Sequence, residues 1–256
     1  MVITAYNSNI ANNVEIAKTA IVEDGVEIGE GTTISDYVII RSGVKIGKNC
    51  QIFPHAVIGE EPQDRTYTAE ESYVEIGENN IIREFVTIHK AVGDQAKTII
   101  GDNNFLMVGV HIAHNCIVGN NNTLANYTNL AGYVEVSKHV TIGGSANIHQ
   151  HCRIGDYAMV AGLCGANHDL LPYMMYIGVP ATAISTNRYA LKKAGMDQLT
   201  RSQLMNAFKI IYNKSQSVPR IMERLETELQ QTEEIKNLIK FMKESKRGFS
   251  MGKLES

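Results

Sequence analysis

An aliphatic residue recurs at every sixth position of this chain, and that period limits the possible fold more than any other feature. One unbroken series runs from Ile100 to Val160, and an earlier series runs from Ile10 to Ile58. A helix repeats its buried face about every 3.6 residues and a strand every two, so a strict period of six fits neither. A fixed period over many turns is typical of a solenoid, in which each unit buries its apolar face against its neighbours.

Small or slim residues precede most of these aliphatic residues by two positions. They are Val110, Cys116, Thr128, Val134, Val140, Ala146, Cys152 and Ala158. A large inward residue paired with a small corner residue defines the hexapeptide repeat, in which three hexads form one triangular coil. Residues eighteen apart should therefore stack in neighbouring coils, about 4.8 Å apart. All four cysteines of the chain stand in the small position, so we expect them to fill the core and to form no disulfide or metal site.

The repeat predicts an all-β solenoid over residues 1–186, and the change to a helical period predicts an α-helical domain over 187–256. The hexads lapse near 59–73 and again near 90–97. Because the hexad pattern stops there, we expect these two stretches to be loops ejected from the coil. Long loops inside an otherwise regular repeat more often have a function than not.

Four helices are predicted in the second domain, where they should cap one end of the solenoid. Gly195 can end the first helix. Thr200 and Gln203 have the spacing of a capping box that opens the second. Ser217 and Pro219 are typical of the start of the third. The fourth carries an apolar face formed by Ile235, Leu238, Ile239 and Met242.

Charge and hydropathy narrow the possible partners. The formal net charge of −3 gives no electrostatic reason to expect nucleic-acid binding. Residues 187–256 hold 14 Lys and Arg against 8 Asp and Glu, which favours an acidic partner near the tail, although a solvated helical surface explains the count equally well. No apolar run is long enough to span a membrane, and Met1–Asn13 lacks the regions of a signal peptide. We therefore predict no membrane span and a cytoplasmic location.

The stacking rule places candidate catalytic residues in one column on an outer edge. His114, Gly132 and Gln150 each follow a hexad aliphatic by two positions, and His168 falls in the same register where the repeat fades. A histidine beside an approachable glycine N–H could act as a general base with an oxyanion donor. An ordinary surface histidine remains the alternative for each member of the column.

Two other kinds of chemistry are less compatible with this column. The spacing of His111 and His114 could chelate zinc on a helix, but in a hexapeptide coil residues three apart lie on different sides of a corner, so we predict no metal site. The column also lacks a nucleophile, because the neighbouring Cys116 should face inward. Direct transfer is therefore favoured over a covalent intermediate.

The segments HIAHNCIVGNNNTLANYTNLAGYVEV and TIGGSANIHQHCRIG give the chain a specific resemblance to a known family. With the GEEPQDRTY loop, VTIHK and the tail motif NRYALKKAG, the whole chain resembles UDP-N-acetylglucosamine O-acyltransferases, which depend on acyl carrier protein and open lipid A synthesis. The resemblance implies a left-handed parallel β-helix and a homotrimer with active sites between subunits. It implies a UDP-sugar acceptor and no cofactor, since the donor is the phosphopantetheine thioester of acyl carrier protein.

The resemblance also implies roles for single residues. His114 matches the catalytic base, and Gly132 matches the donor of the backbone N–H that stabilises the oxyanion. Positions that match substrate contacts are Gln63, Asp64, His89, His111, His149, Gln150, Gly162, Asn187 and Lys193. Among them, Gln63 and Asp64 match loop residues that hold the acyl hydroxyl or the sugar, and Gly162 lies where the family measures acyl-chain length.

Four positions depart from the family pattern. Asn115 replaces an acidic residue, which weakens the support for an imidazolium on the preceding histidine. Lys193 replaces an arginine in the part of the tail that, with Asn187, should approach the donor and the diphosphate, and lysine cannot grip phosphate in a bidentate manner. Tyr133 and Thr66 stand where histidine and lysine are usual.

These departures leave two further interpretations open. The chain could N-acylate another nucleotide-linked amino sugar, with acyl-coenzyme A as donor. It could also be a scaffold solenoid without activity, although the retained column of His114, Gly132 and Gln150 argues against this. The sequence leaves open the acyl-chain length and whether the acceptor atom is oxygen or nitrogen.

Overall fold

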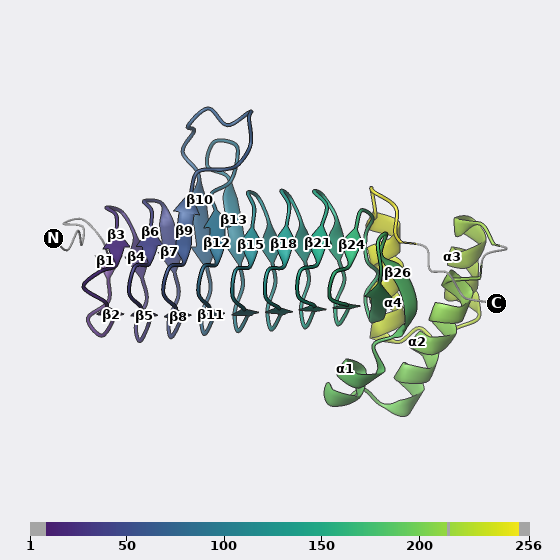
Figure 1. Ribbon diagram of the computed structural model, residues 1–256. Coiled ribbons are helices and arrows are strands. Elements are labelled where there is room, and N and C mark those ends of the chain that lie inside the picture. Colours follow the sequence, from purple (N-terminus) through teal and green to yellow (C-terminus); the bar gives the residue numbers. More distant parts are fainter. Residues whose placement is uncertain (1–8, 214–215, 251–256) are drawn as a thin grey trace.

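The computed structural model describes residues 9–213 and 216–250. Within them, the chain winds into a rod of stacked coils, and helices gather at the end of the rod away from the N-terminus (Figure 1). Each full coil places one short strand on each of three sides, which gives the coil its triangular section.

Three sheets of the described residues form the sides of the rod, and each is named here by its first strand. The β1 sheet contains β1 (Asn9–Ile10), β4 (Glu27–Ile28), β7 (Val44–Ile46), β10 (Tyr73–Ile76), β13 (Lys97–Ile100), β16 (Ile117–Val118), β19 (Glu135–Val136) and β22 (Arg153–Ile154). The β2 sheet contains β2 (Glu15–Ile16), β5 (Thr33–Ile34), β8 (Gln51–Ile52), β11 (Ile81–Ile82), β14 (Phe105–Leu106), β17 (Thr123–Leu124), β20 (Thr141–Ile142), β23 (Met159–Val160), β25 (Met174–Ile177) and β26 (Thr182–Thr186). The β3 sheet contains β3 (Ile21–Val22), β6 (Ile39–Ile40), β9 (Val57–Glu60), β12 (Thr87–His89), β15 (His111–Ile112), β18 (Asn129–Leu130), β21 (Asn147–Ile148) and β24 (Gly165–Ala166).

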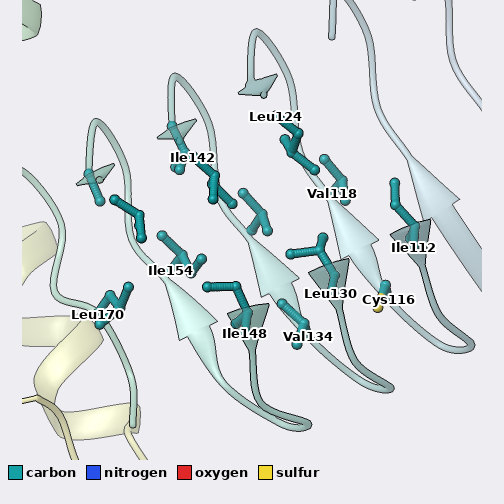
Figure 2. Packing of buried hydrophobic residues seen from close by; sticks show 14 of the residues in the cluster. Ile112, Cys116, Val118, Leu124, Leu130, Val134, Ile142, Ile148, Ile154 and Leu170 are labelled. Carbon is teal, nitrogen blue, oxygen red and sulfur yellow. The ribbon is translucent and has the colours of Figure 1, made fainter. Parts of the chain in front are cut away.

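The strand register confirms the stacking of residues eighteen apart. His111 pairs in parallel with Asn129, which pairs in turn with Asn147. Inside the coils, the hexad aliphatics from Val22 to Val160 are at most 3% exposed and form continuous columns (Figure 2). Burial of each such side chain stabilises the rod by about 1.5–3 kcal/mol. The four cysteines lie in the same core and form no disulfide.

Two loops leave the rod on the same side, between β9 and β10 and between β12 and β13 (Figure 1). They are joined to each other, because Gly93 N–H donates to Glu70 Oε1 at 2.9 Å and Ser72 Oγ donates to Ala91 O at 2.7 Å. Backbone N–H groups of Glu70 itself, Gly93 and Thr68 lower the pKa of Glu70 to about 2. The ionised carboxylate thus holds the two loops together over one corner of the coil.

The tail forms α1 (Arg188–Lys193), α2 (Gln198–Ile211), α3 (Val218–Thr227) and α4 (Glu233–Glu244). The predicted end of α1 is confirmed, because Gly195 follows the helix with φ +77°. The predicted start of α3 is also confirmed, because Ser217 is its N-cap. The capping box predicted at Thr200 was wrong. Asp197 caps α2 instead, because its Oδ1 accepts the Thr200 N–H at 2.7 Å, which makes Thr200 the third helical residue.

The helices close the last coil. In α4, Asn237 Nδ2 donates to Tyr173 Oη at 2.8 Å and to Asp156 Oδ2 at 3.2 Å. The change from strand to helix falls between Thr186 and Arg188. The division into domains at 1–186 and 187–256 stays a prediction, and the outer ends of both ranges lie outside the described residues. None of the described helices combines the length and apolar character needed to cross a membrane.

Candidate active site

A cavity of about 790 Å³ runs along the β3 sheet beside the corner that follows β15. Seven of the predicted site residues line it: Gln63, Asp64, His111, His114, Gly132, His149 and Gln150. The repeat supplies most of them from successive coils, and the first ejected loop supplies Gln63 and Asp64. Residues far apart in the sequence therefore meet because of the eighteen-residue stacking.

His114 lies directly against Gly132, one coil further along. A Cβ at Gly132 would stand 2.5 Å from both Cε1 and Nε2 of His114, so only glycine leaves room for the ring. In the part of the chain that the structure describes, the Gly132 N–H has no hydrogen-bond acceptor. A free N–H therefore stands beside the imidazole, as an oxyanion donor requires.

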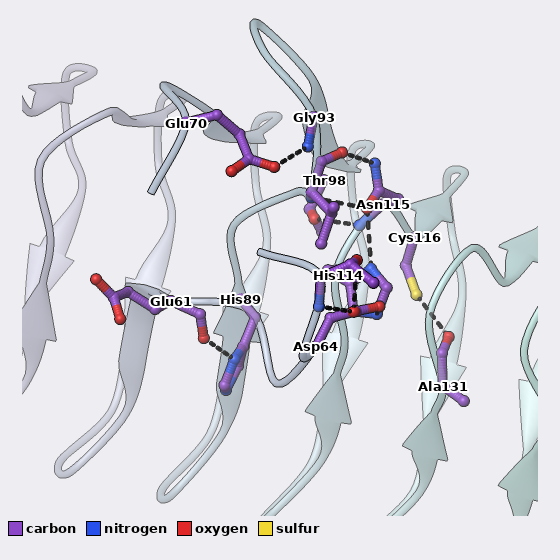
Figure 3. A network of polar contacts seen from close by, with 12 residues as sticks. Glu61, Asp64, Glu70, His89, Gly93, Thr98, His114, Asn115, Cys116 and Ala131 are labelled. Carbon is purple, nitrogen blue, oxygen red and sulfur yellow. Dashed lines mark hydrogen bonds and ion pairs between the residues drawn. The ribbon is translucent and has the colours of Figure 1, made fainter. Parts of the chain in front are cut away.

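Asn115 fixes the tautomer of His114 (Figure 3). Its amide is oriented by the second loop, since Nδ2 donates to Val92 O at 3.0 Å and Oδ1 accepts the Val92 N–H at 2.9 Å. The same Oδ1 lies 2.9 Å from His114 Nδ1. Because an amide oxygen only accepts, Nδ1 carries the proton and Nε2 keeps its lone pair. His114 is thus held in the tautomer that a general base needs.

Asp64 places a negative charge beside this base. Its Oδ2 lies 3.6 Å from His114 Nε2. Its Oδ1 accepts the backbone N–H of Thr66 at 2.8 Å and the Thr66 hydroxyl at 2.7 Å. These two bonds, with the nearby His114, lower the pKa of Asp64, so the carboxylate is ionised at neutral pH. Thr66, which departs from the family pattern, therefore has a clear structural role in holding Asp64.

Two further histidines lie behind the base. His111 lines the cavity, its Nδ1 lies 2.8 Å from Thr87 Oγ1, and burial lowers its pKa to about 4. His89 packs edge-to-face on His111, with 5.1 Å between ring centroids, and its Nδ1 lies 2.6 Å from Glu61 O. Burial also lowers the pKa of His89. His111 is thus neutral at pH 7, and His89 supports it from outside the cavity.

Three predicted contacts lie elsewhere in the single chain. Gly162 stands at another corner, where a Cβ would approach Gly144 O at 3.2 Å. Asn187 and Lys193 line a second cavity, of about 680 Å³, beside α1. Asn187 is also the N-cap of α1, with Oδ1 accepting the Ala190 N–H at 3.3 Å and Nδ2 donating to Tyr157 O at 2.8 Å. The single chain therefore does not bring these three residues to His114.

Other cavity residues were missed by the sequence analysis. Asn129 and Asn147 line the cavity one and two coils beyond His111. The stacking rule, applied to His111 as it was to His114, would have found both. Arg247 lies outside the repeat and gave no signal, yet its Nη2 is 3.0 Å from Nδ1 of His149.

Two other kinds of chemistry considered above were a cysteine nucleophile and a bound metal ion. Cys116 is fully buried, its Sγ lies 3.1 Å from Ala131 O, and burial raises the pKa of the thiol to about 12. It is therefore unsuited to attack a substrate. Among the described residues, no group of three or more His, Cys, Asp or Glu side chains is placed to hold a metal ion. The absence of a metal site stays a prediction.

Known proteins resemble this chain in sequence and in structure. A family model for UDP-N-acetylglucosamine O-acyltransferase, domain 2, matches residues 169–250, and a model of bacterial transferase hexapeptide repeats matches 25–60 and 97–132. An acyl-[acyl-carrier-protein]–UDP-N-acetylglucosamine O-acyltransferase of Thermodesulfovibrio yellowstonii is 41% identical over 96% of each chain. The chain belongs to the UDP-N-acetylglucosamine O-acyltransferase family.

Solved structures of this family agree with the fold. LpxA of Bacteroides fragilis superposes with a TM-score of 0.93 at 35% identity, covering 96% of this chain and 97% of its own. LpxA of Acinetobacter baumannii gives a TM-score of 0.91 at 34% identity, covering 96% and 98%. The predicted left-handed parallel β-helix with C-terminal helices is thereby confirmed. As an acyltransferase of this family, the chain needs a base and an oxyanion donor, and His114 and Gly132 have the geometry for both.

Substitution of Asn115 by Asp tests the role of its amide. A carboxylate beside Nδ1 favours the imidazolium, so the acid limb of the pH–rate profile should move to higher pH. Its second oxygen would face Val92 O in place of a donor, which should lower the free energy of unfolding by about 1–3 kcal/mol. The pH dependence of acyl transfer and urea denaturation measure the two effects.

Asn121→Asp is a matched control, since Asn121 also has φ near +60° but an exposed side chain. If Asn115→Asp and Asn121→Asp had the same acid limb of the pH–rate profile and the same free energy of unfolding, the proposed contacts of the Asn115 amide would be contradicted.

Proposed function

We propose that this chain transfers an acyl group from acyl carrier protein to the 3-hydroxyl of UDP-N-acetylglucosamine, the first step of lipid A biosynthesis. The proposal rests chiefly on one observation: the His114 ring, whose Nε2 keeps its lone pair, lies against Gly132, whose N–H has no acceptor among the described residues, in a cavity large enough for a nucleotide sugar. Membership of the family, whose members carry this activity in their names, supports it.

The geometry is suited to direct attack. His114 Nε2 takes the proton of the sugar hydroxyl while the hydroxyl oxygen bonds to the thioester carbonyl carbon. The carbonyl oxygen becomes an oxyanion, which the Gly132 N–H stabilises. When the carbonyl re-forms, the C–S bond breaks and the leaving thiolate takes the proton back from His114. No covalent enzyme intermediate is needed, in agreement with the buried Cys116.

The neighbouring groups support this proton transfer. Asp64 Oδ2, 3.6 Å from Nε2, stabilises the imidazolium as it forms. Asn115 is uncharged, so in this chain Asp64 supplies the stabilising carboxylate that the family usually has after the catalytic histidine. Neutral His111, Asn129 and Asn147 offer hydrogen bonds to sugar or phosphate oxygens from the β3 sheet. In this proposal the thioester enters as a substrate, and the chain uses no cofactor of its own.

A mass-spectrometric transfer assay tests the function. The donors are acyl carrier proteins of several acyl lengths and acyl-coenzyme A, and the acceptors are UDP-N-acetylglucosamine and its 3-amino analogue. We expect ester formation on UDP-N-acetylglucosamine from a carrier-protein donor, because the tail holds more basic than acidic residues. Transfer to the amino sugar alone, or from coenzyme A alone, would contradict the proposal.

Replacement of His114 by Ala should lower the rate by about 10²–10⁴-fold, because it removes the general base. His168→Ala is the matched control, since His168 continues the register of the column but is exposed and lies outside the cavity. Steady-state kinetics and a melting curve measure activity and folding. Near-normal turnover by a folded His114→Ala enzyme would exclude the assigned base.

We also propose a homotrimer, in which a neighbouring copy completes each site. One corner of the rod exposes a row of apolar side chains, with Phe85 58%, Tyr127 58% and Leu163 75% exposed. Leu163 adjoins Gly162, so packing against this corner would bring Gly162 toward the acyl chain held by another copy. Light scattering should give three times the chain mass, and a monomer would contradict this assembly. The predicted cytoplasmic location remains part of the proposal.

A further inference from the structure

A guanidinium from the C-terminal segment reaches a histidine of the cavity. Arg247 follows α4 by three residues, and its Nη2 lies 3.0 Å from Nδ1 of His149. Its Nε donates to Asn167 O at 2.7 Å, which fixes the plane of the guanidinium. His149 and Asn167 both line the cavity that contains His114. A residue outside the repeat thus contacts two residues that line the site.

The backbone around Arg247 is anchored to the last coil by one buried residue. Asp169, which has no exposed surface, donates its N–H to Gly248 O at 2.9 Å and accepts the Ser250 N–H at 2.8 Å. Its Oδ2 accepts the Ser245 hydroxyl at 2.7 Å. These bonds flank Arg247 on both sides, so the guanidinium has a defined position and is not a free surface charge.

The contact with Arg247 decides the tautomer of His149. Two groups compete for Nδ1: Arg247 Nη2 at 3.0 Å and the carbonyl oxygen of Gln150 at 3.2 Å. A guanidinium only donates, so Nδ1 must present its lone pair to Arg247. Nε2 then carries the proton and is the donor of the ring. Without Arg247, Nδ1 can donate to Gln150 O instead, and Nε2 becomes an acceptor.

We propose that Arg247 is a positioning residue that holds His149 with a protonated Nε2, as a donor to an oxygen of the nucleotide sugar. A UDP-sugar offers hydroxyl and diphosphate oxygens, which accept hydrogen bonds, and its negative charge is also attracted by the nearby guanidinium. This inference rests on the proposed function for the identity of the ligand. The tautomer of His149, however, is independent of any activity.

The test compares Arg247→Met with Lys246→Met. Methionine keeps an unbranched apolar stem and removes the donors, and Lys246 offers the same charge change one residue away with an exposed side chain. We expect ¹⁵N spectra of labelled wild-type enzyme to show His149 with an unprotonated Nδ1 and a protonated Nε2. In Arg247→Met, the signals should move toward protonated Nδ1. The KM for the UDP-sugar should rise about tenfold, the loss expected for a charge-assisted hydrogen bond, with kcat within about twofold. Lys246→Met should change neither.

A wild-type His149 that carries its proton on Nδ1 would overturn the proposal, even if Arg247→Met failed to fold. A folded Arg247→Met enzyme with unchanged His149 signals or unchanged KM would overturn it as well. If the proposed function is wrong, wild-type enzyme forms no ester while the ¹⁵N spectra remain as expected. If only this inference is wrong, ester forms but the spectra or the KM disagree.

Discussion

The whole molecule depends on the stacking of one coil on the next. Each coil buries an aliphatic residue on each of three sides, and the parallel backbone bonds between coils hold residues eighteen apart in register. A shift of one residue would carry the aliphatics out of the core, so the register is strongly specified. That register, and no local motif, sets His114 against Gly132. The site is therefore a by-product of the same packing that stabilises the rod.

The remaining site groups come from places where the repeat is broken. The first ejected loop supplies Asp64, and the second supplies the Val92 peptide that orients Asn115. Glu70 ties the two loops together through the Gly93 N–H, so the loop that carries Asp64 and the loop that orients Asn115 are held to each other. The coil alone provides an unsupported histidine beside a free N–H. The loops add the negative charge of Asp64 and fix the tautomer of His114, and the proposed acyl transfer uses both.

The sequence predicted what periodicity controls and missed what depends on side-chain partners. The hexad repeat and the stacking of residues eighteen apart were sufficient to predict the coils, the buried cysteines and the contact between His114 and Gly132. They could not show that Thr66 holds Asp64, because this contact depends on the fold of the first loop. They also could not show that the amide of Asn115 contacts both Val92 and His114, since these contacts join the second loop to the coil. The contact of Arg247 with His149 was missed because it joins the C-terminal segment to the coil. At the start of α2, Thr200 and Gln203 have the spacing of a capping box, but the Asp197 carboxylate accepts the Thr200 N–H and caps the helix. The functions of Gly162, Asn187 and Lys193 rest on the resemblance, because in one chain these residues lie away from the cavity.

The most direct test of the site is a crystal structure of the enzyme with the acylated UDP-sugar bound. It would show whether the corner formed by stacking is the place where the ester is made. The sugar 3-oxygen should lie within hydrogen-bond distance of His114 Nε2, and the ester carbonyl oxygen should accept the Gly132 N–H. A product whose ester lies beyond reach of both groups would contradict the assignment of this corner as the catalytic centre.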